Sequence, residues 1–182
     1  MGWIILIVVI VLILLWVVST YNSLIGLKNK VKDNWAQVDV LLKQRADEIP
    51  NLVETVKGYT SHEKGTLEAV INARNKAVSA TTKDEEMAAN GELTQALGRL
   101  FALTEAYPDL KANTNFMDLQ TKLDEIEKKI AFSRQFYNDI VMKYNNKVQM
   151  VPSNIVAGLF HFKEEKFFEA TEDEKKVPQV KF

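Results

Sequence analysis

The sequence predicts an all-α protein: an N-terminal transmembrane helix that continues into an antiparallel up-and-down bundle of four, or three longer, helices. Three observations predict this fold class. Nearly all of residues 1–18 are large and apolar. Beyond them, apolar side chains recur every three or four residues, which is the period of a helix with one buried face. No stretch shows the apolar–polar alternation of a half-buried strand.

Composition sets the limits for function. The chain has 182 residues, of which 47% are hydrophobic and 26% charged, and its formal net charge is −1. Basic residues are interspersed with acidic ones, so we expect no nucleic-acid partner. The absence of cysteine excludes disulfides, thiolate nucleophiles, cysteine metal sites and a lipoprotein anchor. We expect three parts: an anchor over 1–20, a bundle over 21–150 and a tail over 151–182.

The apolar start has the length of a membrane span. A helix over residues 1–18 is about 27 Å long, close to the ~30 Å hydrocarbon core of a bilayer. Trp3 and Tyr21 lie where interfacial aromatic residues are favoured. A cleaved signal peptide is the alternative, but no basic residue precedes the apolar run, and Val17 to Ser19 match the small-x-small cleavage pattern poorly. We therefore predict a retained, single-pass signal anchor in the cell membrane.

Charge next to the span predicts its orientation. Lys28, Lys30 and Lys32 follow it, and no charged side chain precedes it. The positive-inside rule then places the bundle in the cytoplasm. The same lysines suit contact with anionic lipid headgroups, and a solvated helix face is the alternative.

The bundle helices follow from apolar spacing and from breakers. A seven-residue repeat runs from Leu24 to Ile49, with Arg45 as its one charged interruption. Pro50 then ends or kinks this helix. A second helix is predicted over 51–80. If Pro50 only kinks the chain, these two helices form one rod and the bundle has three segments.

Two more helices complete the predicted bundle. The sequence from Thr82 to Glu85 matches a capping box that opens a third helix, although Gly91 leaves a start near Asn90 open. Tyr107 and Pro108 close that helix, because the residue before a proline disfavours the α region. A fourth helix over 116–148 has the longest apolar stripe.

The tail and three phenylalanines leave alternatives open. Residues 155–160 are apolar and are expected to pack on the bundle or on a neighbouring molecule. Residues 171–176 are charged and expected to be mobile, and 177–182 suit either a strand-like ligand or a disordered terminus. Phe101, Phe132 and Phe136 widen their stripes, either as core or as a docking surface between subunits.

No catalytic or metal-binding motif emerges. The two histidines, His62 and His161, belong to no zinc motif, and no Glu-x-x-His pair or phosphate-binding glycine loop occurs. Neighbouring acids, such as Glu125 and Glu127, are typical of solvated helix faces. We predict no catalytic residue, no cofactor and no metal site.

Several blocks together resemble the LemA family of bacterial proteins. They include Trp35 to Val40, Ile49 to Tyr59, Glu105 to Asn113, Arg134 to Asn138, and Pro152 to Asn154 with Gly158 to Phe160. The resemblance implies a single membrane anchor, a helical bundle and no established enzymatic activity. Some relatives carry a lipoprotein-type cysteine, which this chain lacks. Those relatives would face away from the cytoplasm, so an extracytoplasmic bundle is the alternative orientation.

The shared blocks supply the candidate interaction or structural residues. Polar members are expected to cap helix ends, to bond across helices or to meet a partner. The candidates are Trp35, Pro50, Asn51, Tyr107, Pro108, Phe136, Tyr137, Asn138, Leu159 and Phe160.

The leading function hypothesis is a non-enzymatic, membrane-anchored scaffold or adaptor that forms homo-oligomers or docks a protein partner. Its expected partners are membrane lipid and other copies of the chain. The alternative is a membrane-associated enzyme subunit acting on lipid or envelope material, which requires a polar pocket with convergent titratable groups. An adaptor or sensor for a protease or signalling protein fits the same sequence features as the scaffold.

Overall fold

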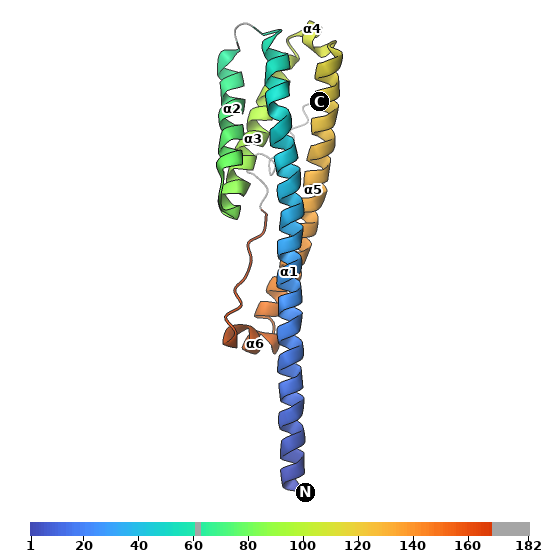
Figure 1. The fold of residues 1–182 in the computed structure, drawn as a ribbon, viewed down its shortest axis with the longest axis vertical. Coiled ribbons are helices and arrows are strands. Elements are labelled where there is room, and N and C mark those ends of the chain that lie inside the picture. Colours follow the sequence, from blue (N-terminus) through green and yellow to red (C-terminus); the bar gives the residue numbers. More distant parts are fainter. Residues whose placement is uncertain (61–62, 169–182) are drawn as a thin grey trace, which may run out of the picture. The chain divides into compact units, whose positions relative to one another are not determined.

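The computed structural model describes residues 1–60 and 63–168, and these residues form six α-helices and no strand (Figure 1). The predicted all-α class, with a long apolar N-terminal helix and a helical bundle, is confirmed. The up-and-down order of four helices stays a prediction. The helices are α1 (Gly2–Lys57), α2 (Lys64–Ser79), α3 (Lys83–Thr104), α4 (Pro108–Lys111), α5 (Thr114–Gln149) and α6 (Ser153–Leu159).

Helix α1 continues through Pro50 and ends at Lys57. A proline lacks the N–H that would bond to the carbonyl four residues earlier, here that of Ala46. The Nε of Arg74, on α2, donates to this carbonyl at 3.3 Å. A side chain from the next helix thus satisfies the acceptor that proline leaves open. The alternative in which Pro50 ends the helix is therefore wrong, and the second helix begins at Lys64 rather than near residue 51.

Contacts within the chain define two compact units. Unit 1 contains Met1–Val38 and Ser133–Phe167. Unit 2 contains Asp39–Phe132 and, among later described residues, Phe168. The domain boundaries predicted at residues 20 and 150 stay predictions.

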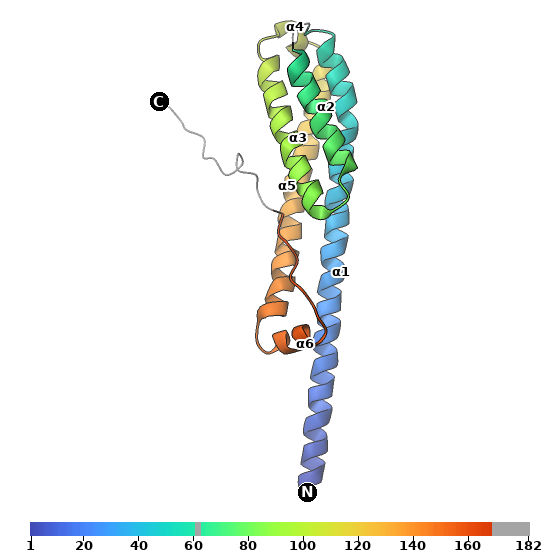
Figure 2. The same ribbon diagram turned by 90° about the vertical axis from the view of Figure 1, so that its left-hand side faces the viewer.

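Unit 1 is built from the first part of α1, the last part of α5, and α6. Both views show α6 beside α1 (Figure 1 and Figure 2). An extended segment of residues 162–167 follows α6. The buried core contains Leu24, Val31, Trp35 and Val38 from α1, Tyr137, Val141 and Tyr144 from α5, and Val156 and Ala157 from α6. The apolar tail segment thus packs within its own chain, with Val156 and Ala157 buried and Phe160 in contact with Tyr21.

Unit 2 contains α2, α3, α4 and the adjoining parts of α1 and α5. Helices α2 and α3 pack side by side and are joined by residues 80–82 (Figure 2). The capping box is confirmed, because the Thr82 hydroxyl accepts from the Glu85 amide and the Glu85 carboxylate accepts from the Thr82 amide. Helix α3 therefore starts at Lys83 rather than near Asn90. It ends at Thr104, and Pro108 opens α4.

The core of unit 2 is a single cluster of apolar side chains from all its helices. Its fully buried members include Leu52 and Val56 of α1, Val70 of α2, Leu93 and Leu100 of α3, and Leu110 of α4. The predictions for His62, residues 171–176 and residues 177–182 lie outside the described residues.

Candidate functional site

The apolar start of α1 is the candidate membrane anchor. Within the described residues, α1 is the one helix long and apolar enough to cross a membrane, and none of its most apolar window is buried. Trp3, a predicted interface residue, is exposed near its start. An apolar stretch of helix without a buried residue is compatible with lipid contact.

An aromatic cluster lies where α1 leaves this apolar stretch. The Tyr21 ring meets the ring of Phe160 edge to face at a centroid distance of 4.8 Å, and that of Phe162 at 5.6 Å. The Lys28 ammonium lies 5.8 Å from the Phe162 ring centre, within range of a cation–π contact. The structure thus brings together three predicted residues: Tyr21 and Phe160, which are in contact, and Lys28, which lies near the same Phe162 ring as Tyr21. Lys30 and Lys32 are exposed.

Side chains of α5 hold the extended segment 162–167 by its backbone. The Asn145 amide pairs with Glu165 twice: its Nδ2 donates to the Glu165 carbonyl at 2.8 Å, and its Oδ1 accepts from the Glu165 N–H at 2.9 Å. The hydroxyl groups of Tyr137 and Tyr144 donate to the carbonyls of Lys166 and Lys163. We call this arrangement the backbone clamp. Because it contacts main-chain atoms, it recognises an extended conformation rather than particular side chains.

The tyrosines of the backbone clamp are held in place because they are buried in the core of unit 1. Tyr137 is fully buried and its ring packs edge to face on Trp35, with centroids 5.3 Å apart. Burial raises the pKa of the Tyr144 phenol, and the Glu165 carboxylate raises it further. Tyr144 therefore stays protonated and remains a hydrogen-bond donor to the Lys163 carbonyl.

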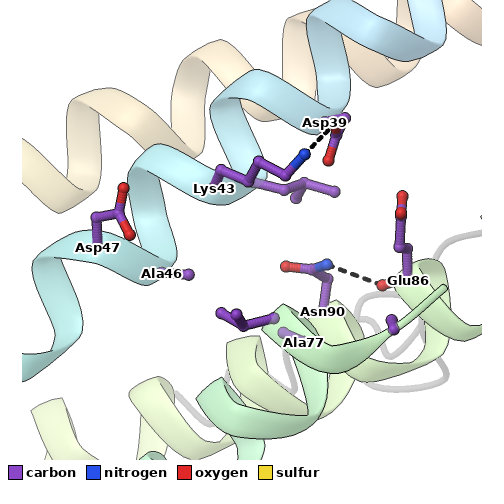
Figure 3. Close-up of a pocket in the computed structure, with 10 residues that line it drawn as sticks. Asp39, Lys43, Ala46, Asp47, Ala77, Glu86 and Asn90 are labelled. Atoms are coloured by element: carbon purple, nitrogen blue, oxygen red, sulfur yellow. Dashed lines mark hydrogen bonds and ion pairs between the residues drawn. The ribbon is translucent and has the colours of Figure 1, made fainter.

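A polar pocket of about 390 Å³ lies in unit 2 between α1 and the adjoining ends of α2 and α3. Figure 3 shows Asp39, Lys43 and Asp47 of α1 opposite Glu86 and Asn90 of α3. The Lys43 ammonium bonds to Asp39 at 2.7 Å. The side chains that line this pocket include no hydroxyl, thiol or imidazole group. Among the described residues, no group of three His, Cys, Asp or Glu is placed to hold a metal ion.

Glu86 lines this pocket, and its carboxyl group and that of the preceding residue, Glu85, have opposite electrostatic environments. Burial raises the pKa of Glu86, and the Asp39 charge raises it further, while Lys43 and Lys83 act against these effects. Hydrogen bonds from Thr81 and Thr82 lower the pKa of Glu85. The pocket thus provides convergent titratable groups, as the enzyme alternative requires, but only carboxyl, amino and amide groups among its polar side chains.

A carbon NMR titration of the side-chain carboxyl groups is expected to separate these two glutamates. Glu86 should titrate above the usual range for glutamate and Glu85 below it. The Glu85 contribution to folding stability is present above its unfolded pKa and is lost as pH falls through its folded pKa. The Glu86 contribution has the opposite sign, since it is present at low pH and is lost as pH rises through its raised pKa. Coincident titration of the two groups would contradict these assignments.

A buried polar network adjoins the pocket. Arg45, with 3% of its side chain exposed, donates from one guanidinium nitrogen to Thr94 at 2.9 Å and to Glu127 at 2.6 Å. Its other terminal nitrogen donates to Asn90, to the carbonyl at 3.2 Å and to Oδ1 at 2.9 Å. This network links α1, α3 and α5 inside unit 2, and Asn90 belongs to both the network and the pocket.

Comparison with protein families identifies the chain. The model of the LemA family matches residues 34–182. The chain belongs to the LemA family. This LemA-family chain is 23% identical over 175 residues to magnetosome protein MamQ 2 of Paramagnetospirillum magneticum, covering 82% of this chain and 64% of that protein. It is 24% identical over 159 residues to protein LemA of Metamycoplasma hominis, covering 87% and 73%.

A third relative is magnetosome protein MamQ of Magnetospirillum gryphiswaldense, which is 21% identical over 174 residues, covering 81% of this chain and 64% of that protein. The chain thus spans less than two thirds of the length of these magnetosome proteins. None of the relatives has the name of an enzyme. Together with the apolar span, the comparisons support a membrane-associated LemA-family protein.

The family blocks of unit 2 lie at helix ends and at an internal proline. Pro50 and Asn51 are exposed, and the Asn51 carbonyl accepts from the Thr55 hydroxyl. The Tyr107 hydroxyl donates to Glu63 at 3.2 Å. The exposed Pro108 occupies the first turn of α4, where its missing N–H costs no helical bond.

The family blocks of unit 1 divide between core and surface. Trp35 and Tyr137 are buried against each other, Asn138 is half-buried, and Phe136, Leu159 and Phe160 are exposed to a large degree. Asn145 was not identified from the sequence. The one feature that could have indicated it is that a polar residue stands beside the apolar stripe of the fourth predicted helix. Arg45 was noted as an interruption, but the partners of Arg45 had no local signal.

Proposed function

We propose that this LemA-family chain is a non-enzymatic, membrane-anchored scaffold or adaptor that self-associates or docks a protein partner at the membrane. One observation carries the proposal: the exposed apolar start and the first packed residues belong to the same unbroken helix, α1. Thr20 is already buried two residues after Val18, and Leu24 follows. The anchor thus enters the packing of unit 1 without a flexible linker.

Such an anchor has a physical consequence for association. Copies held in one membrane share a thin layer, so their effective concentration for each other exceeds that of the free protein. A helix without a linker also restricts the orientation of unit 1. Surfaces that bind each other only weakly can therefore support self-association when all copies share one orientation.

Exposed aromatic residues support the docking interpretation over the core-filling one. Phe132 of unit 2 and Phe136 of unit 1 are more than half exposed, whereas Phe101 of unit 2 is partly buried against the core. Large exposed apolar side chains favour contact with a partner. Phe101 thus takes the core role, and Phe132 and Phe136 are each a candidate docking residue of their own unit.

Crosslinking in intact cells, followed by mass spectrometry, tests the proposal. We expect crosslinks between copies of the chain, or to a recurrent protein partner, close to Phe132 or Phe136. Substitution of each by glutamine should reduce those crosslinks, while Ile71→Gln, at another exposed apolar position on α2, serves as the matched control. A detergent-solubilised protein that stays strictly monomeric at all concentrations and copurifies with nothing would contradict the proposal.

The proposed orientation is cytoplasmic, with an extracytoplasmic bundle as the alternative. Lys28, Lys30 and Lys32 support the cytoplasmic side through the positive-inside rule. Protease access on sealed vesicles of known orientation distinguishes the two sides.

A further inference from the structure

Residues 150–160, which we call the α6 corner, form an eleven-residue stretch without a charged side chain. They include the turn after α5, the whole of α6 and Phe160. We infer that the α6 corner is a second membrane-contacting surface, which lies in the interfacial layer of the same bilayer that the α1 span enters. This inference rests on the membrane anchor of the proposed function.

Both faces of α6 are apolar, but only one is covered. Val156 and Ala157 are buried within unit 1. On the opposite face, Ile155 is 66% exposed and Leu159 is 67% exposed, one helical turn apart. A surface helix in water normally carries polar side chains on its outer face. The outer face of α6 instead has the composition of a surface that contacts an apolar medium.

The turn before α6 extends this exposed apolar surface. Met150 and Val151 are both more than half exposed, and they directly precede Pro152 and α6. Four large apolar side chains thus lie exposed within ten residues of chain. Isolated exposed apolar residues are common on proteins, whereas a contiguous group marks an interaction surface.

The corner lies at the level where α1 leaves the apolar span. A cavity in unit 1 of about 410 Å³ is lined by Trp16 and Thr20 of α1 together with Met150, Val151, Pro152 and Ser153. Trp16 lies two residues before the end of the apolar run at Val18. If the span fills the hydrocarbon core, this side of the corner lies at the boundary between hydrocarbon and headgroups.

The other end of the corner lies in the headgroup region. Phe160 packs on Tyr21, at a ring distance of 4.8 Å. Tyr21 is three residues, or about 4.5 Å of helix, beyond Val18. The interfacial layer on each side of a bilayer is roughly 5–8 Å thick. Both ends of the α6 corner therefore fall within this layer.

The charges near the corner suit a lipid surface. Lys143 and Lys147 line the cavity beside Trp16, and no carboxylate lines it. Long lysine side chains can place their ammonium groups at the phosphate level while their methylene groups stay on apolar surface. Cations at this height favour anionic lipids. The combination of an apolar outer face with flanking lysines is typical of interfacial helices.

Continuity with the span favours lipid over a second copy of the chain as the occupant. The corner is packed on the helix that enters the bilayer, so insertion of the span places the corner in lipid without any further association. Two contacts with the membrane, the span and the corner, would fix the rotation of unit 1 about the span axis. That rotation decides which faces of unit 1 neighbouring copies can present to each other.

Depth measurements with single-cysteine variants test this inference. The chain has no native cysteine, so one introduced cysteine carries a unique nitroxide label. Ile155→Cys and Leu159→Cys report on the outer face of α6, Val9→Cys on the span, and Gln135→Cys is an exposed control on α5 of unit 1. Full-length protein is reconstituted into vesicles of phosphatidylcholine with phosphatidylglycerol. Paramagnetic resonance then compares collisions with oxygen, which concentrates in lipid, and with a water-soluble nickel chelate.

We expect labels at residues 155, 159 and 9 to collide mainly with oxygen, and the label at residue 135 mainly with nickel. Nickel access at 155 and 159 equal to that at 135, with residue 9 still in lipid, would overturn the inference and leave the anchor intact. Nickel access at residue 9 would overturn the anchor itself. Shielding of 155 and 159 from both reagents, with dipolar broadening between labels, would assign the face to a second copy and also overturn the inference.

Discussion

Replacement of Arg45 by alanine is expected to destabilise unit 2 by about 3 kcal/mol, because it leaves a cavity and unsatisfied buried polar groups. The guanidinium binds Thr94, Glu127 and Asn90 from a side chain that is 3% exposed. Without it, the Asn90 Oδ1 loses its charged donor. The Glu127 carboxylate adds little to this cost, because its side chain is 41% exposed and water can replace its partner.

Urea unfolding followed by circular dichroism in detergent measures this loss, and hydrogen exchange localises it to α3 and the adjoining α1. Glu127→Gln is the matched control, since an amide oxygen still accepts from Arg45 and the group is partly solvated. We expect it to cost less than about 1 kcal/mol. Equal unfolding of Arg45→Ala and the unmodified chain would show that the network contributes nothing to stability.

A double variant separates the role of charge from that of packing. Arg45→Met keeps much of the side-chain volume but leaves the Asn90 Oδ1 without a donor. Arg45→Met combined with Asn90→Leu removes both ends of the pair, and replacing a buried polar pair by apolar residues is often close to neutral. We expect the double variant to be more stable than Arg45→Met alone. Such non-additivity would measure the coupling between the two residues.

Local signals predicted most of the fold. The apolar run, the capping box at Thr82 and the long stripe of α5 depend on neighbours within one or two helical turns, which the sequence displays directly. Pro50 is different. Its place inside α1 depends on Arg74, 24 residues later in the chain and on another helix, which bonds to the carbonyl of Ala46. Only the folded arrangement shows that a donor is available there, so the sequence left the end of the first helix open.

The sequence predicted only some members of the candidate site and none of the contacts between them. Tyr21, Tyr137 and Phe160 were identified from the sequence, but their contacts were not. Tyr21 packs on Phe160 and Phe162, and Tyr137 bonds to the Lys166 carbonyl, because segments distant in the chain pack together. The Asn145 contact to Glu165 involves backbone atoms, which no side-chain pattern reveals. Arg45 interrupts an apolar stripe, and this marks its position as unusual. The stripe does not indicate which residues Arg45 bonds to.

Loss of the Asn145 donor is expected to loosen the backbone clamp. Asn145 uses its donor and its acceptor on the two backbone groups of Glu165, as a neighbouring strand would. In Asn145→Asp the carboxylate can still accept from the Glu165 N–H but cannot donate to the Glu165 carbonyl, and it places a negative charge beside that oxygen. We expect residues 162–167 to be less tightly held, by about 1–3 kcal/mol, because a buried hydrogen bond is replaced by a repulsive contact.

Asn146→Asp is the matched control, because it makes the same substitution at the adjacent, exposed position of α5. Hydrogen exchange at the Glu165 amide and tryptic cleavage at Lys163 and Lys166 should both accelerate in Asn145→Asp and stay unchanged in Asn146→Asp. Lower pH should partly restore Asn145→Asp, since a protonated carboxyl can donate to the Glu165 carbonyl. If cleavage is unaffected in both variants, the two tyrosine hydroxyls hold the segment without Asn145. If cleavage is equally faster in both variants, the segment is released by the added charge on α5 and not by the loss of the Asn145 donor.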